Sequence, residues 1–175
     1  MVLCRCNAPL VSQCFRFLRA GRKANIQGRD VGQGLVSTVK KLKADTVEQL
    51  VAKLEDWLHG EQRKENAKRN PSDTRLIALQ DKHDCIAAFC EDQTTVAGVI
   101  AKIESVFTDD KNGTGIRLSS GHRAKGLEAD RVFILMPKGA ECPHPMAKSA
   151  WQREQEMNIL YVMQTRARKE LCYVS

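Results

Sequence analysis

Residues 116–135 read IRLSSGHRAKGLEADRVFIL: a short apolar segment, a polar loop and a longer apolar run. The apolar residues at 116–119 and 131–135 predict two strands. The loop between them holds a hydroxyl, an imidazole, a lysine, a glycine and a carboxylate within nine positions. Because loops fixed between rigid strands concentrate binding residues, we expect the functional site here.

Both ends of the chain alternate strands and helices. Residues 2–26 read as strand, helix and strand, with Pro9 suited to the first helical turn and Gly21 ending the helix. A helix over 147–168 and a last strand over 170–174 follow a loop at 137–145. About five short strands with helices between them predict an α/β fold with a doubly wound parallel sheet.

The middle of the chain lacks strand patterns. A turn is expected at 109–113, and apolar residues recur at helical spacing through 44–107. Thr46 and Ser72 are the expected N-caps of two of these helices. The glycine-rich 28–34 segment has no Gly-Lys-Ser/Thr and is read as the start of another helix, capped by Asp30 with Gln33. We therefore predict a sheet domain from 1–43 and 111–175, with a helical insertion at 44–110.

Composition excludes several classes of protein. The chain has 175 residues, 42% of them hydrophobic and 28% charged, as in a soluble globular domain. No apolar run approaches the roughly 20 residues that span a bilayer. The N-terminus has no signal-peptide pattern, so we expect a cytoplasmic protein without membrane contact and with reduced cysteines. The spacing of the seven cysteines fits no zinc site, and no metal site is expected.

The net charge of +7 is unevenly placed. Residues 1–43 hold nine Lys or Arg against the single acid Asp30, whereas the remaining 132 residues hold nineteen bases and twenty acids. A localised basic excess favours a polyanionic partner such as nucleic acid. A solvated basic face with no partner is the alternative interpretation.

Two long segments and one short one resemble a single family. Residues 118–128, LSSGHRAKGLE, resemble motif V of the UvrD/Rep-type superfamily 1 DNA helicases, and residues 155–167, QEMNILYVMQTRA, resemble their motif VI. Residues 2–7, VLCRCN, are similar to motif IV. The resemblance implies the second, C-terminal RecA-like motor domain, with a parallel sheet and an abbreviated helical insertion. In such motors ATP binds with Mg²⁺ between two domains.

The resemblance also implies roles at the nucleotide. Arg166 would be an arginine finger, and Arg5 a second arginine contacting phosphate. Glu128 would accept a hydrogen bond from the ribose, and Gly126 would allow close backbone approach. An arginine that only satisfies helix-end carbonyls is the alternative for Arg166. Cys4 stands where the family often has an aromatic residue, which puts adenine stacking from this position in doubt.

On the DNA side, the resemblance implies that Ser120 and His122 face single-stranded DNA and that Lys125 couples the two ligands. Ordinary loop roles are the alternatives for His122 and Lys125. Ser120 replaces the usual threonine and keeps its hydroxyl.

The sequence contains no Walker A loop and no magnesium-binding Asp-Glu pair after an apolar strand. The resemblance therefore implies half of an ATP-dependent DNA helicase, acting in repair or replication, that needs an N-terminal RecA-like domain as partner. We expect a fragment or split-gene product that is inactive as an isolated chain. A non-enzymatic module that binds single-stranded DNA or a partner protein is the alternative.

Overall fold

The computed structural model describes residues 1–108 and 115–175. The chain divides into two compact units. The first comprises Met1–Gly28 and Asp109–Ser175, and the second comprises Arg29–Thr108. The turn predicted at 109–113 lies outside the described residues.

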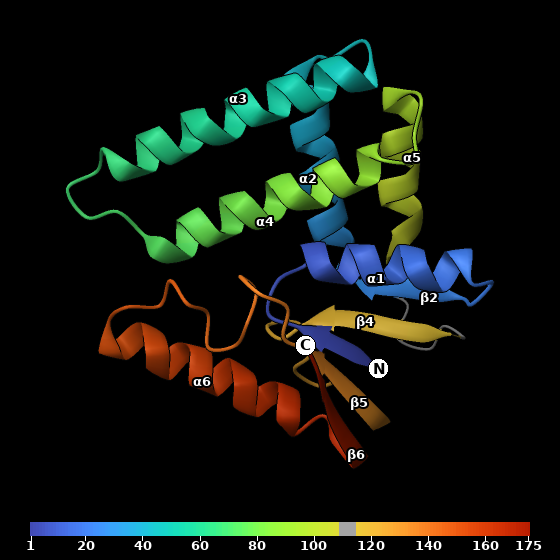
Figure 1. The fold of residues 1–175 in the computed structure, drawn as a ribbon, viewed down its shortest axis with the longest axis vertical. Coiled ribbons are helices and arrows are strands. Elements are labelled where there is room, and N and C mark those ends of the chain that lie inside the picture. The colour runs from blue at the N-terminus through green and yellow to red at the C-terminus, as the bar shows by residue number, and fades with distance from the viewer. Residues whose placement is uncertain (109–114) are drawn as a thin grey trace. The chain divides into compact units, whose positions relative to one another are not determined.

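The first unit is a parallel sheet with a helix on each side (Figure 1). Its elements are β1 (Val2–Cys4), α1 (Ala8–Arg19), β2 (Ala24–Gln27), β4 (Ile116–Ser120), β5 (Ala129–Leu135), α6 (Ala150–Gln164) and β6 (Ala167–Val174). The strands lie in the order β2-β4-β1-β5-β6, and all four pairings between these neighbours are parallel. The prediction of an α/β fold with a parallel sheet of about five strands is confirmed, and this topology is consistent with a RecA-like fold.

The core of this unit lies between the sheet and α6. Leu3, Val132, Ile134 and Met163 are fully buried there. The two strand residues Val132 and Ile134 alternate with the exposed Arg131 and Phe133, so one face of β5 packs on α6. This packing fixes α6 against β5 and β6, the strands that precede and follow it in the sequence.

The parallel register separates two edges of the sheet. Cys4, at the end of β1, pairs with Ser120 and Leu135 at the carboxyl ends of β4 and β5. At the other edge, Ala129 pairs with Ala167 at the amino ends of β5 and β6. Seven residues of β5 span about 20 Å between these edges. Any residue that precedes β5 or β6 is therefore far from one that follows β1 or β4.

The second unit is helical, with its own core. Its elements are α2 (Arg29–Leu42), α3 (Val47–Asn66), α4 (Asp73–Cys90), α5 (Val96–Val106) and the two-residue β3 (Phe107–Thr108). The predicted caps are confirmed: the side chains of Thr46 and Ser72 accept hydrogen bonds from the backbone N–H groups of Gln49 and Arg75. Helices α3 and α4 run side by side (Figure 1) and bury Leu50, Leu54 and Ile86 completely.

Helix α2 belongs with the helical unit, whereas the sequence placed residues 1–43 with the sheet. The reason is packing, because α2 contacts α3, α4 and α5. A Cβ at Gly32 would lie 2.7 Å from Cβ of Phe107, so this glycine allows a close approach within the unit. The helix also begins at Arg29, which places Asp30 in its first turn instead of at the N-cap.

Helix α6 is shorter than predicted and begins after Ser149. The Ser149 hydroxyl accepts from the N–H of Gln152, whose side chain accepts from the backbone of Ser149, forming a capping box. None of the helices among the described residues has the length and apolarity needed to cross a bilayer.

Candidate functional site

The loop after β4 is held at both ends by backbone hydrogen bonds. The N–H of Gly121 donates to the carbonyl of Cys4 at 2.9 Å, and the N–H of Ala124 donates to the carbonyl of Ser120 at 3.0 Å. At the far end, the N–H of Leu127 donates to the carbonyl of Ala124 at 3.0 Å. Ala124 is fully buried. The loop is thus a series of tight turns fastened to the core.

Gly121 brings this loop against α6. A Cβ on Gly121 would lie 2.6 Å from Cγ2 of Ile159 and 2.9 Å from Sδ of Met163. Real Cβ atoms essentially never show separations below 3.0 Å, so a side chain at this position would require Ile159 and Met163 to shift. Gly121 lies inside the motif V segment, but the sequence pattern alone predicted no role for it.

A buried ion pair lies at the carboxyl edge of the sheet. The Arg5 Nε donates to Oε1 and Oε2 of Glu156 at 2.9 and 2.8 Å, and Nη2 donates to Oε1 at 2.8 Å. Both side chains are 8% exposed. The backbone N–H of His144 donates to Oε2 of Glu156 at 3.1 Å. The carboxylate therefore connects β1, α6 and the loop before α6.

Each member of the pair stabilises the ionised form of the other. Burial alone would raise the pKa of Glu156, but hydrogen bonds and charge from Arg5, with the N–H of His144, hold that pKa below its usual value. Burial alone would lower the pKa of Arg5, but Glu156 raises it. Both groups are therefore ionised at neutral pH.

His122 and Lys125 are exposed on the loop, whereas Ser120 is buried with 6% of its surface exposed. Desolvation and then the charge of Arg5 lower the pKa of His122, while Glu156 acts in the opposite sense. His122 therefore lies within electrostatic reach of the buried pair and favours its neutral form at neutral pH. Of the three expected DNA contacts, His122 and Lys125 present their side chains to solvent.

Arg166 and Glu128 lie together at the amino edge of the sheet. The backbone N–H of Ala129 donates to the carbonyl of Arg166 at 3.0 Å. The Arg166 side chain donates to the carbonyls of Val162 at 2.9 Å and Leu127 at 3.4 Å, and to the Thr165 hydroxyl at 2.9 Å. Glu128 is exposed. Gly126, two positions before it, has a left-handed φ of 82°.

Most of the chain matches a known family of domains. The model of the UvrD-like helicase C-terminal domain matches residues 13–175. The chain belongs to this family. It is also 30% identical over 86 residues to a protein of Bacillus subtilis (strain 168) named putative ATP-dependent DNA helicase YjcD. That similarity covers 44% of this chain and 11% of YjcD, so the chain corresponds to a small part of that protein.

The resemblance assigns Arg5, Glu128 and Arg166 to one nucleotide, but in this helicase C-terminal domain they lie at two edges of the sheet. Arg5 follows β1 and therefore lies at the carboxyl edge, whereas Glu128 and Arg166 precede β5 and β6 at the amino edge. The Arg5 guanidinium is also bound by Glu156. Arg5 lies outside the residues that match the family model. The contact of Arg5 with phosphate stays an untested prediction that this geometry does not favour.

The amino edge of the helicase domain presents the Arg166 guanidinium and the exposed Glu128. The three hydrogen-bond acceptors of the Arg166 side chain are neutral oxygens, and among the described residues no carboxylate lies within ion-pairing distance of it. Its positive charge is therefore available to an anion. Among residues 1–108 and 115–175 no three His, Cys, Asp or Glu side chains form a group that could hold a metal ion.

Sequence reasoning also missed Glu156. It lies in the quoted motif VI segment, seven residues before the fully buried Met163 and therefore on the same face of α6. A carboxylate on the apolar face of a helix signals a buried partner, because an isolated buried charge is costly. The partner, Arg5, lies 151 positions away, and no local pattern identifies it.

Proposed function

We propose that this chain is the second motor half of an ATP-dependent DNA helicase. In this proposal it supplies Arg166 and Glu128 to an ATP site shared with a first RecA-like domain. The loop 120–125 contacts single-stranded DNA. Since the chain has no phosphate-binding loop, it does not hydrolyse ATP by itself.

The observation that supports this proposal most is the meeting of Arg166 with the end of the motif V loop. The Arg166 guanidinium and the carbonyl of Leu127 are 3.4 Å apart, directly beside the exposed Glu128. Two segments separated by 39 positions thus bring a cation and a carboxylate to one edge. A cation suits the γ-phosphate and a carboxylate suits the ribose hydroxyls.

Bound ATP with Mg²⁺ would supply the phosphoryl group that is transferred to water. The part of Arg166 is to place a fixed planar charge where negative charge shifts during that transfer. For this, its hydrogen bonds to the carbonyls of Val162 and Leu127 must be exchanged for hydrogen bonds to phosphate oxygens, while those carbonyl groups return to solvent. Glu128 would orient the nucleotide from the same edge.

The loop offers a path between the two ligands. Gly121 contacts α6 near the carboxyl edge, and Leu127 contacts Arg166 at the amino edge. A shift of the DNA-contacting residues would therefore be transmitted to the arginine through packed elements, as a coupled two-state change requires.

The test is ATP hydrolysis measured with and without a first motor domain of a UvrD-like helicase, supplied as a separate polypeptide. The chain alone should show no turnover above background. The mixture should show DNA-stimulated turnover, and Arg166→Ala should lower it by about 10³-fold or more. Arg166→Lys should rescue little, because an ammonium lacks the planar fork.

Arg168→Ala is the matched control. Arg168 is exposed, lies two positions further on and pairs with Asp130 at 3.2 Å, so its loss should leave turnover unchanged. Appreciable DNA-stimulated hydrolysis by the isolated chain would refute the half-motor proposal.

A non-enzymatic module remains the second candidate, because the carbonyl-bound Arg166 is satisfied without any nucleotide. It predicts DNA binding that ATP and the first motor domain leave unchanged. Equal affinity for DNA with and without both additions would favour it.

A further inference from the structure

The basic excess near the N-terminus is not explained by the site described above. Three of its nine cations, Lys40, Lys41 and Lys43, lie at the end of α2 in the second unit. All three are exposed, and no ion pair to them is present among residues 1–108 and 115–175. Three uncompensated ammonium groups within four positions repel one another unless an anion lies between them.

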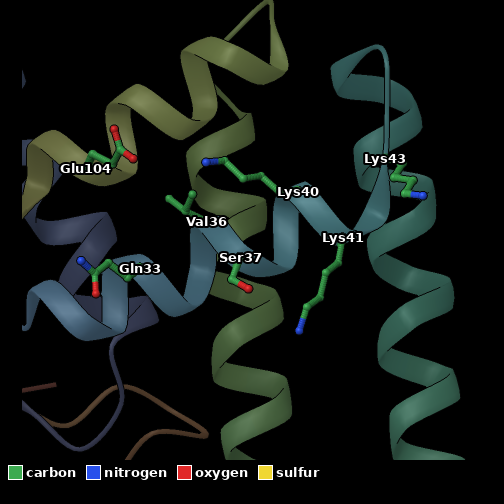
Figure 2. A pocket seen from close by; sticks show the side chains of 7 residues that line it. All are labelled: Gln33, Val36, Ser37, Lys40, Lys41, Lys43 and Glu104. Carbon is green, nitrogen blue, oxygen red and sulfur yellow. The ribbon is translucent and has the colours of Figure 1, made fainter.

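These lysines line a groove, here called the α2 groove (Figure 2). Its volume is about 530 Å³, and its lining comprises Gln33, Val36, Ser37, Lys40, Lys41, Lys43 and Glu104. Figure 2 shows that the lining side chains come from α2, from the segment that follows it and from α5. The whole groove therefore belongs to the helical unit.

The lining suits an extended polyanion. The ammonium groups, the Ser37 hydroxyl and the Gln33 amide are the donors that bind phosphate oxygens in protein–nucleic acid interfaces. From Gln33 to Lys40 the helix rises about 10 Å, which is about the axial rise of three nucleotides in one strand of a duplex. Val36 forms an apolar floor, and its side chain is buried.

The neighbouring helix adds positive charge. The Lys82 Nζ on α4 donates to Oγ1 of Thr38 on α2 at 3.4 Å. Burial and then the charges of Arg75 and Lys41 lower the pKa of Lys82. A positive potential thus surrounds this part of α2, although the carboxylate of Glu104 limits it on the α5 side.

We propose that the α2 groove binds the phosphodiester backbone of a nucleic acid strand, as a second contact separate from the loop in the first unit. The groove has no aromatic lining, so it holds the backbone without stacking or reading bases. Binding is consequently independent of sequence and strongly dependent on salt. The helical insertion then has a function of its own, beyond the proposed function of the sheet unit.

The experiment measures fluorescence anisotropy of a labelled oligothymidylate and of a labelled duplex of equal length, at several salt concentrations. The triple variant Lys40→Ala, Lys41→Ala and Lys43→Ala should lose at least about tenfold in affinity at low salt. The slope of log K against log[salt] should fall by about 2 for the single strand and about 3 for the duplex. The probe with the larger loss identifies the form of nucleic acid that the groove binds.

The control variant removes Lys64, Lys68 and Arg69, which are cations of the same unit outside the groove. It loses the same charge and should keep most of the affinity. Glu104→Gln provides a change of opposite sign: it should tighten binding about threefold, because it removes a carboxylate beside the phosphates. Thermal melts followed by circular dichroism verify that each variant is folded.

A background variant, His122→Ala with Lys125→Ala, separates this inference from the proposed function. The groove variant should lose affinity in that background too, whether or not the loop binds DNA. Unchanged affinity of the groove variant for both probes overturns the inference, and so does an equal loss in the control variant. If the groove variant loses ATP binding and keeps both DNA probes, the groove is a nucleotide site and the inference fails.

Discussion

Arg5 and Glu156 join the end of β1 to α6 by three hydrogen bonds of 2.8–2.9 Å, in a place where both side chains are 8% exposed. One strand, one helix and the loop before that helix therefore meet at a pair of opposite charges. Such a pair contributes little net stability compared with apolar packing, but the loss of one partner leaves the other charge buried and uncompensated.

Glu156→Ala should therefore lower the free energy of unfolding by about 3–5 kcal/mol. The measurement is urea denaturation followed by circular dichroism. Glu170→Ala is the control, because it breaks the exposed pair with Arg131, whose atoms are 2.8 Å apart, and should cost about 0–1 kcal/mol. Equal costs for the two variants would contradict the role assigned to the buried pair.

Stability should fall on acidification in a way that depends on Glu156. Its pKa is lowered from 4.5 in the folded state, so its contribution is complete above pH 4.5 and is lost as pH falls towards the folded value. Glu156→Gln should flatten this part of the profile. The pKa values of His122 and His144 are lowered from 6.5, so protonation of these histidines also lowers stability, beginning at a higher pH than for Glu156. This loss of stability occurs in both proteins. Urea midpoints across this range test the difference between the two profiles.

Gly121→Ala should destabilise the first unit by about 1–3 kcal/mol, because the new methyl group would overlap Ile159 and Met163. Gly60→Ala in α3 is the matched control. A Cβ there meets nothing within 4 Å, so alanine should stabilise the helix by about 0.5–1 kcal/mol. Thermal denaturation of the two variants should shift in opposite directions.

Gly126→Ala tests backbone conformation alone. A Cβ at this position meets nothing within 4 Å, but φ is 82°. Alanine should cost about 1–2 kcal/mol, and Gly126→Asn should cost less because asparagine adopts left-handed conformations more readily. Equal stability of the glycine and alanine proteins in urea would show that the loop can take up another conformation.

The cysteines should react very unevenly. Cys172 is exposed on β6, and the other six are buried. Burial raises the pKa of Cys90 to about 11 and that of Cys142 to about 12. A thiol reagent should therefore label one equivalent rapidly in the native protein and seven after denaturation, and Cys172→Ser should abolish the rapid phase. Rapid native labelling of several equivalents would contradict the burial of these thiols.

The sheet was predictable because its signals are local. Each strand is a short apolar run next to a turn, and Gly21 with φ 70° ends α1 where the sequence placed the end of that helix. The caps of α3 and α4 were predictable for the same reason. The prediction of α6 was longer at both ends, because the apolar pattern did not distinguish the cap at Ser149 from the residues before it.

The features that the sequence did not predict depend on contacts between residues that are distant in the chain. The assignment of α2 to the helical unit depends on packing such as that of Gly32 on Phe107, 75 positions away, which no window of sequence displays. The resemblance assigns Arg5, Glu128 and Arg166 to one nucleotide, but Arg5 follows its strand whereas Glu128 and Arg166 precede theirs, so the sheet separates them. The membership of the helicase C-terminal family was predicted correctly from motifs V and VI.

Helix α6 begins near one edge of the sheet and ends at the other. Ten residues separate the anchored Glu156 from Arg166, a lever arm of about 15 Å. A rotation of about 4° about that anchor moves the guanidinium by about 1 Å, an error that can cost a catalytic step about 100-fold. The stiffness of one buried ion pair thus limits how accurately an arginine at the opposite edge of the sheet can be positioned.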